Sequence, residues 1–446
     1  MRAQENDLIT RTGPGTAGGE LLRRFWQPVA LLDELTAARP VVPVTIMGER
    51  LVLFRDESGR YGLMDRHCPH RGADLCFGRL EDGGLRCPFH GWLFDATGQC
   101  LEQPAEPEGS TYYKKLRARA YKCVERSGIV FAYMGPGEPP PFPEFDCFMA
   151  PREYTFAFKG LWECNWLQAL EVGIDPAHTS YLHRFFEDES PDEAYGKQFR
   201  GTAAGEEIPL TRILRESARP RIELEDTAYG FRIVTRRDLR DGREHVRVTN
   251  LAFPQAIVIP MGPQMTITQW HVPVDDTHCY WYSIFTSFGD PVDRETMRAQ
   301  RLQGHSLPEY RPHTNRANGW GFDAEDQRQR TYTGLGADVN VQDQWAVESQ
   351  GPIHDRTKEH LGKSDVAIIH YRKLLKRAIE AASSNEAVPF VLGEQAASQV
   401  RGPVAIDVVA PPGEGDASWK RKDLERRGGT KWARDPGLLE AAAVTR

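Results

Sequence analysis

Short apolar runs separated by turn-forming residues dominate the first third of the chain. Residues 41–46, 51–54 and 128–133 are such runs, with Gly, Asp and Pro signals between them. Runs of this length and spacing are typical of a small antiparallel barrel or sandwich. The segment 135–143, Gly-Pro-Gly-Glu-Pro-Pro-Pro-Phe-Pro, can continue neither a helix nor a sheet. We therefore expect a strand-rich domain over residues 1–145 that ends in a Pro-rich interdomain linker.

The spacing of apolar residues changes after the linker. Residues 162–172 have helical spacing that Gly173 ends. A second helix is expected to begin at Asp175-Pro176, because Asp suits the N-cap and Pro suits the first helical position. Period-two alternation then predicts an antiparallel sheet with one buried face, with strands at residues 222–225, 231–235, 246–249, 265–270 and 280–285.

Residues 359–382 return to helical spacing. The apolar positions recur every three or four residues, at Ile368, Tyr371, Leu375, Ala378 and Ala382. With the preceding strands, this predicts a sheet packed by helices over residues 146–400. The chain of 446 residues is long enough for two or three domains. We expect an α+β protein: an all-β domain followed by a domain built on an antiparallel sheet.

The last segment, residues 401–446, is rich in Pro, Gly and charge. Its run Lys-Arg-Lys-Asp-Leu-Glu-Arg-Arg at 420–427 is basic enough to suggest an anionic partner. Because the run is short and mixed with acids, a solvated tail or an arm that wraps another subunit is the favoured interpretation.

Charge and hydropathy exclude several classes of protein. The formal net charge is −7, from 56 Lys and Arg against 63 Asp and Glu, whereas a sequence-independent nucleic-acid binder is normally basic. No stretch reaches the roughly 18 apolar residues of a membrane helix; the longest candidate, 251–261, is interrupted by Pro254, Gln255 and Pro260. The start of the chain shows no secretory signal or transit peptide. We expect a soluble cytoplasmic protein without a nucleic-acid or membrane partner.

The eight cysteines are too sparse for a disulfide framework. No two of them form a C-x2-C pair, which excludes a thioredoxin-type motif and the usual four-cysteine zinc ribbon. Two cysteines, however, lie beside histidines: Cys68-Pro-His70-Arg-Gly and Cys87-Pro-Phe-His90-Gly-Trp. Two thiolates and two imidazoles that converge from two such loops can hold either a tetrahedral zinc or a two-iron cluster with the cysteines on one iron and the histidines on the other.

Each loop supplies one Cys and one His, and this mixed pairing resembles the Rieske [2Fe-2S] domain. The resemblance implies that Cys68, His70, Cys87 and His90 are the cluster ligands. Neutral imidazole ligands raise the potential of such clusters to about −150 to +300 mV. Rieske proteins of respiratory complexes carry an additional cysteine in each loop, and the matching positions here are Ala73 and Phe89.

A second constellation is Asp175-Pro-Ala-His178-Thr-Ser-Tyr-Leu-His183. Read alone it is weak, because two histidines five residues apart differ in direction by about 140° on a straight helix. After a Rieske domain, it resembles the mononuclear iron site of Rieske non-heme iron oxygenases, including the preceding Asn165-Trp166 and the later Glu171. The resemblance implies that His178 and His183 bind Fe(II).

Two imidazoles and one carboxylate on one face of Fe(II) leave the opposite face open for O2. The carboxylate is expected from a late acidic helix in the family, and Asp343 is our choice, with Asp338 and Glu348 as alternatives. By the same resemblance, Asp175 connects a mononuclear-iron histidine to the Rieske histidine of a neighbouring subunit. This arrangement implies a homotrimer or a multiple of three.

The Trp-Glu-Cys-Asn-Trp segment at 162–166 and the segments at 348–353, 355–356 and 361–365 look like the phthalate dioxygenase branch of this family. The resemblance implies a helix-grip (START-like) catalytic domain and a terminal oxygenase that uses O2. The segment 13–18 matches G-x-G-x-x-G, but it follows no buried strand. The chain also lacks the C-x4-C-x2-C of a plant-type ferredoxin. We therefore expect electrons from a separate NAD(P)H-dependent reductase with a flavin and a ferredoxin-type cluster.

The expected reaction is hydroxylation of an aromatic substrate, an aromatic carboxylate such as phthalate, by ring cis-dihydroxylation. The alternative is a monooxygenase that hydroxylates or removes O- or N-methyl groups. A buried substrate carboxylate needs a cation, and Arg200 and Arg247 are the candidates. An electron carrier and a zinc-stabilised binding module are the other classes considered, and iron content with an absorption spectrum separates them.

Overall fold

The computed structural model describes residues 1–188, 208–430 and 432–433. Helices α1 (Ala3–Thr10) and α2 (Ala17–Leu22) open the chain. A six-stranded antiparallel sheet follows, in the order β1-β10-β9-β4-β3-β2. Its strands are β1 (Gln27–Leu31), β2 (Val41–Ile46), β3 (Glu49–Arg55), β4 (Tyr61–Asp65), β9 (Ala120–Arg126) and β10 (Ile129–Tyr133). The predicted runs at 41–46 and 51–54 lie in β2 and β3, and the run at 128–133 lies in β10 apart from Gly128.

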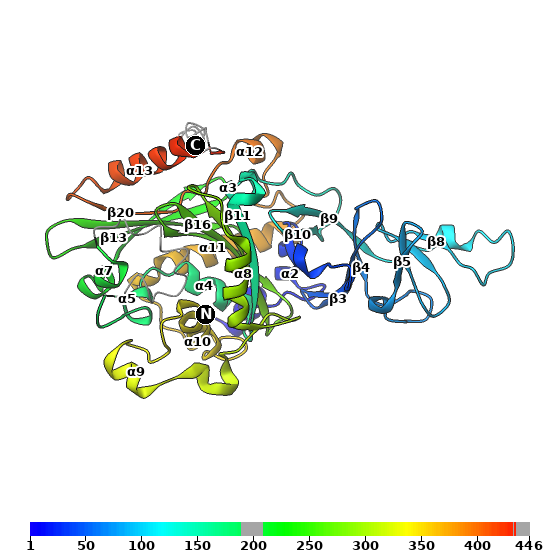
Figure 1. The fold of residues 1–446 in the computed structure, drawn as a ribbon, viewed down its shortest axis with the longest axis horizontal. Coiled ribbons are helices and arrows are strands. Elements are labelled where there is room, and N and C mark those ends of the chain that lie inside the picture. Colours follow the sequence, from blue (N-terminus) through cyan, green and yellow to red (C-terminus); the bar gives the residue numbers. More distant parts are fainter. Residues whose placement is uncertain (189–207, 431, 434–446) are drawn as a thin grey trace.

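A small four-stranded sheet is inserted between β4 and β9. It consists of β5 (Arg79–Glu81), β6 (Gly84–Arg86), β7 (Leu93–Asp95) and β8 (Cys100–Glu102). In Figure 1 this sheet forms the tip of a protrusion at one end of the molecule. Both cysteine–histidine loops precede or lie within this insertion.

The second domain is built on an eight-stranded antiparallel sheet. Seven strands follow the order β11-β17-β16-β15-β14-β13-β12, and β20 pairs with β14. The strands are β11 (Thr155–Trp162), β12 (Arg221–Thr227), β13 (Gly230–Asp238), β14 (Glu244–Ala252), β15 (Ala256–Gly262), β16 (Met265–Pro273), β17 (Cys279–Ser287) and β20 (Ile406–Ala410). A two-stranded pair, β18 (His305–Ser306) with β19 (Arg311–Pro312), lies outside this sheet.

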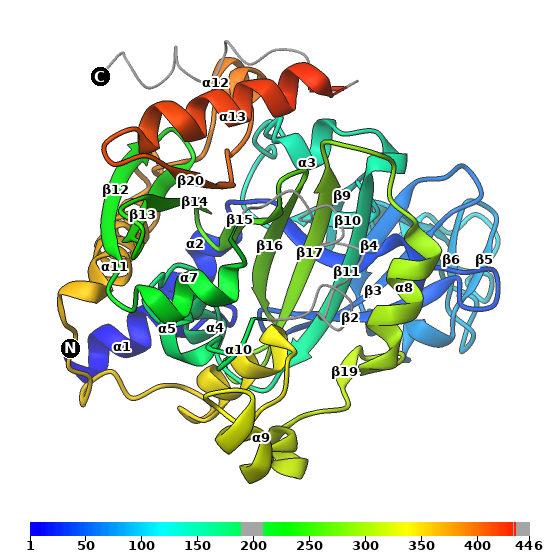
Figure 2. The same cartoon turned by 60° about the vertical axis from the view of Figure 1, so that its left-hand side comes forward.

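Helices surround the large sheet, as Figures 1 and 2 show. They are α3 (Asp146–Met149), α4 (Trp166–Gly173), α5 (Thr179–Leu182), α7 (Leu210–Glu216), α8 (Arg294–Gln303), α9 (Ala324–Gln329), α10 (Val339–Glu348), α11 (Val366–Ser383), α12 (Glu394–Gln399) and α13 (Gly415–Gly429). Short 3-10 helices cover Leu32–Glu34, Leu75–Phe77, Tyr112–Lys115, Arg152–Tyr154, Arg316–Gly321 and Lys363–Asp365. None of the helices in the described part of the chain is long and apolar enough to span a membrane.

The α+β class and the antiparallel sheet are confirmed, but three element predictions need correction. The helix expected over 359–382 begins only at Val366. The helix expected over 162–172 begins only at Trp166, because the Asn165 side chain accepts a hydrogen bond from Leu167 N and caps it. The preceding β11 was missed because it is buried along its whole length and shows no alternation. The helix expected at Asp175-Pro176 covers only Thr179–Leu182.

The prediction of a solvated C-terminal tail is wrong for residues 406–429. This segment forms β20, which pairs with β14, and α13. The basic run finds its anionic partners inside the chain: Arg427 donates to Asp146 at 2.5 Å, and Arg426 donates to Asp423 at 2.5 Å. Composition suggested a tail because these buried ion pairs look like a charged surface in sequence. Residues 434–446 lie outside the description.

The two domains share one apolar core. Phe131 on β10 contacts Trp270 on β16 edge to face, with ring centroids 5.6 Å apart. Phe142 of the Pro-rich linker packs against Phe131 at 5.2 Å. The linker is therefore part of the packed interface between the domains, and the boundary near residue 145 remains our prediction.

Candidate metal centres

The two cysteine–histidine loops have the same backbone geometry. Gly72 N donates to Cys68 O at 2.8 Å, and Gly91 N donates to Cys87 O at 3.0 Å. Both glycines have a positive φ, 76° and 75°, which a residue without Cβ adopts at no steric cost. In both loops the glycine follows the cysteine by four residues. The repeated spacing therefore builds two matching turns that present a Cys and a His.

The turns bring the four predicted cluster ligands together. The rings of His70 and His90 lie with centroids 4.5 Å apart, and the Cys68 and Cys87 thiols are buried. Burial raises the pKa of Cys68 to about 12, so a thiolate there needs a neighbouring cation. His90 Nδ1 is buried and has no hydrogen-bond partner among the described residues. Two thiols and two imidazoles with an orphaned ring nitrogen fit a Rieske cluster.

The second constellation converges as predicted. His178 Nε2 lies 3.2 Å from His183 Nε2, and Asp343 Oδ1 lies 3.7 Å and 3.3 Å from these two atoms. Donor atoms bound to one first-row ion at about 2.0–2.2 Å are at most about 4.4 Å apart, and all three separations are shorter. Asp343 Oδ1 is buried without a hydrogen-bond partner in the described chain. Two imidazoles and one carboxylate of this geometry fit the facial triad of Fe(II).

The histidine pair meets because the helix between its members is very short. His178 precedes α5 and His183 follows it, with φ −102° and ψ 26° that leave helical geometry. The 140° offset of a straight helix therefore does not apply. Arg237 on β13 stabilises this turn, because its guanidinium donates to Pro176 O at 2.9 Å and to Ser180 Oγ at 3.2 Å.

Electrostatics favours the metal-binding protonation state at two of the three triad residues, the neutral His178 and the ionised Asp343. Burial, together with the neighbouring imidazole, lowers the pKa of His178. Burial opposes ionisation of Asp343, but His183 and then His178 outweigh it and lower the pKa of this carboxyl. Burial also disfavours the charged form of His183, yet the Asp343 carboxylate raises its pKa. A divalent cation replaces the proton that these groups otherwise compete for.

Gln342 is a site residue that the sequence did not reveal. Its Nε2 donates to Gly336 O at 2.6 Å, so its Oε1 is the acceptor that faces His183 Nδ1 at 2.7 Å. His183 therefore carries its proton on Nδ1 and leaves Nε2 free to bind a metal. The side chain is fully buried. Its position next to Asp343 was the only signal in the sequence.

The two alternative carboxylates, Asp338 and Glu348, make structural hydrogen bonds instead. Asp338 caps α10 by accepting from Asn340 N at 2.9 Å. Glu348 accepts from Glu163 N at 2.8 Å and from Trp320 Nε1 at 2.7 Å. Only Asp343 joins the histidine pair among the described residues with metal-binding side chains.

Asp175 lies beside the triad on the His178 side. Its Oδ2 is 3.8 Å from His178 Nδ1, and its Oδ1 accepts from Ala177 N at 2.7 Å. Asn165 and Glu171 were also part of the resemblance to the family's iron site, and both make structural contacts. Asn165 donates to Thr10 O at 3.0 Å, and Glu171 is paired with Arg356 at 2.8 Å and with Arg372 on α11.

The strand register places Arg247 on the face of the sheet that carries the metal triad. Arg247 lies on the same face of the sheet as Leu251. Leu251 pairs with Ile257 on β15, and Gly173 packs on Ile257. Gly173 belongs to α4, the helix that directly precedes the turn with His178 and His183. The charge of Arg247 acts against protonation of His183. Arg247 also donates to Asp407 at 2.6 Å. The other predicted arginine, Arg200, lies outside the described residues.

A second unpredicted residue, His271 on β16, faces the same space. Ser283 Oγ donates to Gln269 Oε1 at 2.8 Å, so the Gln269 amide nitrogen donates to His271 Nε2 at 3.3 Å. Burial lowers the pKa of His271 to about 3, which keeps it neutral. Its proton is therefore on Nδ1, which is buried without a partner among the described residues. A lone histidine on a strand gives no sequence signal for this role.

Fold and sites together define an oxygenase component with a Rieske domain and a mononuclear metal centre. The Rieske [2Fe-2S] domain family matches residues 25–121, and the family described as LigXa C-terminal domain like matches residues 132–407. The chain is 36% identical over 401 residues to the phthalate 4,5-dioxygenase oxygenase subunit of Pseudomonas putida, covering 86% of this chain and 88% of that protein. The chain therefore belongs to the family of Rieske oxygenase oxygenase subunits, which are oxidoreductases that bind a Rieske [2Fe-2S] cluster and a mononuclear iron.

Other relatives differ in their reactions. The 5,5'-dehydrodivanillate O-demethylase oxygenase subunit of Sphingobium sp. is 34% identical over 392 residues, covering 86% of this chain and 82% of that protein. The tert-butanol monooxygenase / tert-amyl alcohol desaturase oxygenase subunit of Aquincola tertiaricarbonis is 35% identical over 394 residues, covering 84% and 77%. The fold resembles that of dicamba monooxygenase bound to dicamba, with a TM-score of 0.55 and 19% identity over 81% of this chain and 99% of that chain.

Proposed function

We propose that this protein is the terminal oxygenase that hydroxylates an aromatic carboxylate, such as phthalate, by ring cis-dihydroxylation. The observation that carries the proposal is the position of Arg247, on the triad-bearing face of the sheet and close enough to His183 to influence its pKa. Arg237 also lies nearby, within range of the Asp407 and Asp175 carboxylates. A guanidinium on this face can pair with the carboxylate of an anionic substrate.

His271 supplies a second recognition group in this proposal. Its neutral imidazole presents an Nδ1–H donor whose direction is fixed by the Ser283–Gln269–His271 chain. An unpaired buried donor is costly, and a substrate oxygen that accepts from it removes that cost. We therefore assign Arg247 to the substrate carboxylate and His271 to a substrate oxygen.

The metal groups supply O2 activation at the triad and single electrons from the cluster. The chain's own residues hold them: Cys68, His70, Cys87 and His90 at the cluster, and His178, His183 and Asp343 at the iron. The neutral His183 Nε2, fixed by Gln342, and the ionised Asp343 provide the donor atoms. An iron held by these three ligands would keep coordination positions for O2.

In Figure 1 the small sheet of the cluster domain lies in the protrusion on the right, whereas α5 and α10, the helices of the iron ligands, lie in the left half of the molecule. This separation supports the proposal that electrons arrive from another copy, in a homotrimer or a multiple of three. Asp175 is then placed to accept an N–H from His178 and one from His90 of the partner subunit. A separate NAD(P)H-dependent reductase, with a flavin and a ferredoxin-type cluster, loads the cluster. Because that reductase draws on NAD(P)H, we expect the enzyme in the cytoplasm.

A monooxygenase reaction, hydroxylation or O- or N-demethylation of an aromatic compound, is the second candidate. It is favoured by the 34% identity to an O-demethylase subunit. Both candidates use the same metal ligands and differ in how the substrate lies over the iron.

The test is NADH-dependent O2 consumption by the purified oxygenase with a reductase of this family. The panel contains phthalate and other aromatic carboxylates, methoxybenzoates, N-alkyl aromatics and tert-butanol. Consumption that is coupled to product with an aromatic carboxylate supports the proposal. Formaldehyde release from methoxybenzoates alone would establish the second candidate, and coupling only with tert-butanol would overturn both.

A further inference from the structure

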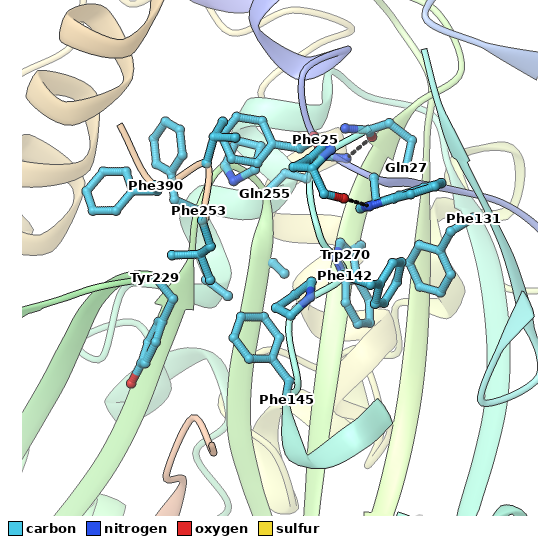
Figure 3. Close-up of a pocket in the computed structure, with 18 of the residues that line it drawn as sticks. Phe25, Gln27, Phe131, Phe142, Phe145, Tyr229, Phe253, Gln255, Trp270 and Phe390 are labelled. Carbon is cyan, nitrogen blue, oxygen red and sulfur yellow. Dashed lines mark hydrogen bonds between the residues drawn. The ribbon is translucent and has the colours of Figure 1, made fainter. Parts of the chain in front are cut away.

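A second pocket lies on the face of the large sheet that points away from the metal triad. Successive residues of a strand point to opposite faces, so Trp270 lines this pocket whereas His271 faces the triad. Ala256 pairs in register with Ala252 on β14 and with Trp270 on β16, and both alanines line the pocket. Figure 3 shows the pocket between the N-terminal segment, the Pro-rich linker and the sheet. The sheet itself therefore separates it from the metal site.

The lining is aromatic and uncharged. Among the described residues that line the pocket, there is no Asp, Glu, Lys, Arg or His. Ring contacts within it include Phe142 with Phe148 at 4.6 Å and Phe253 with Phe390 at 4.9 Å. An aromatic ligand gains from edge-to-face and offset contacts with such walls. A carboxylate, in contrast, would lose its hydration without finding a cation.

One polar atom in the lining has no partner. Gln27 Nε2 donates to Leu22 O at 2.7 Å, so Gln27 Oε1 must accept, and Gln255 Nε2 donates to it at 2.6 Å. This chain fixes the orientation of the Gln255 amide and leaves its Oε1 as a free acceptor. That oxygen is buried without a hydrogen-bond partner in the described structure, and only 1% of the Gln255 surface is exposed.

The other polar groups of the lining are already used. Trp26 Nε1 donates to Pro140 O at 2.9 Å, and the Tyr229 hydroxyl donates to Asn250 Oδ1 at 2.9 Å. A ligand that satisfies Gln255 must therefore bring one hydrogen-bond donor. The cavity has a volume of about 80 Å³, so the ligand must be small.

We propose that this pocket is a second ligand site that binds a small uncharged phenol. The aromatic walls hold the ring, and the phenolic hydroxyl donates to Gln255 Oε1. The site discriminates by charge in the opposite sense to the metal site: it accepts a phenol and rejects an aromatic carboxylate.

Equilibrium dialysis of the metal-loaded enzyme with fluorinated probes tests the proposal. 4-Fluorophenol, 4-fluorotoluene and 4-fluorobenzoate are measured on both sides of the membrane by ¹⁹F NMR. The phenol should bind more tightly than the toluene, by about 2- to 12-fold for one neutral hydrogen bond. Binding should persist in His183→Ala, which alters only the metal site, and the benzoate should not compete for it.

Two pocket variants and one matched control locate the bound phenol. Gln255→Leu should remove the preference for phenol over toluene, and Ala252→Phe should fill the space and abolish binding of both. Gln269→Leu, the same change on the opposite face of the sheet, should leave phenol binding unchanged. The cluster absorption spectrum reports whether each variant is folded.

Three results overturn the proposal. The first is that phenol does not bind to the folded wild-type enzyme and that a phenol-soaked crystal has only water in the pocket. The second is that phenol binding is lost in His183→Ala. The third is that phenol binding is unchanged in both folded pocket variants. If Ala252→Phe does not fold, the probe preferences of wild-type and Gln255→Leu decide the question. None of these outcomes depends on the identity of the enzyme's substrate.

Discussion

Arg247 on β14 donates to Asp407 on β20 at 2.6 Å, and His245 lies 3.0 Å from the same carboxylate. The C-terminal segment thus holds the arginine that we assign to the substrate. Burial works against ionisation of Asp407, but Arg247 and His245 outweigh it and lower its pKa to about 2.

Asp407→Asn should lower stability at neutral pH and much less in acid. Because the folded pKa of about 2 lies below the unfolded value, the contribution is present above pH about 4 and is lost as pH falls toward 2. We expect a loss of roughly 2–3 kcal/mol at pH 7, measured by urea unfolding at pH 7 and near pH 2. An equal loss at both pH values would mean that the charge of Asp407 is not what stabilises the fold.

His183→Ala and Asp343→Ala should each remove the mononuclear iron and leave the brown cluster. The reason is that one lost ligand leaves only two donors on one ion. Iron analysis and the absorption spectrum of the purified variants measure this. Loss of colour would mean that the two sites were misassigned, and normal iron content and activity of Asp343→Ala would mean that Asp343 is not a ligand.

Gln342→Leu should weaken binding of Fe(II) by about 10- to 100-fold, the usual effect of removing a residue that orients a metal ligand. Without the Gln342 acceptor, His183 can place its proton on Nε2 and lose its donor atom. Competition with a chelator measures the affinity. Gln350→Leu is the matched control, because Gln350 is exposed and lies just after α10. An equal loss of Fe(II) affinity in both variants would argue against the orienting role of Gln342.

Asp175→Asn should keep both metal centres loaded but slow electron transfer between subunits. The amide cannot accept an N–H from both sides as a carboxylate does. Rapid mixing of the reduced enzyme with O2 and substrate follows oxidation of the cluster. Full turnover in this variant would refute the bridging role.

Arg247→Met should raise KM for an aromatic carboxylate by about 10- to 100-fold, because a hydrogen bond to a charged group contributes about 1.5–3 kcal/mol. The uncharged amide of the same substrate should lose less. Steady-state O2 consumption with both compounds measures the two KM values. An equal rise in KM for the carboxylate and the amide would mean that Arg247 has only a structural role.

Sequence predicted best what a few neighbouring residues determine. The cluster loops were found because Cys68 and Gly72, like Cys87 and Gly91, define their turn within five residues. Asp343 was chosen through resemblance, since only the fold brings it to His183. Gln342 and His271 could not be predicted, because their roles depend on single hydrogen bonds in a buried setting. β20 was missed because the charges around it, such as Arg427, pair with distant residues such as Asp146.

The central claim is that this chain inserts oxygen from O2 into an aromatic carboxylate. The most direct measurement is product analysis by mass spectrometry after turnover of phthalate under ¹⁸O2, with a reductase and NADH. We predict a ring cis-diol in which both new oxygens carry the label, formed by wild type and absent with His183→Ala. Label-free product, or O2 consumption that yields only peroxide with every aromatic carboxylate tested, would contradict the account.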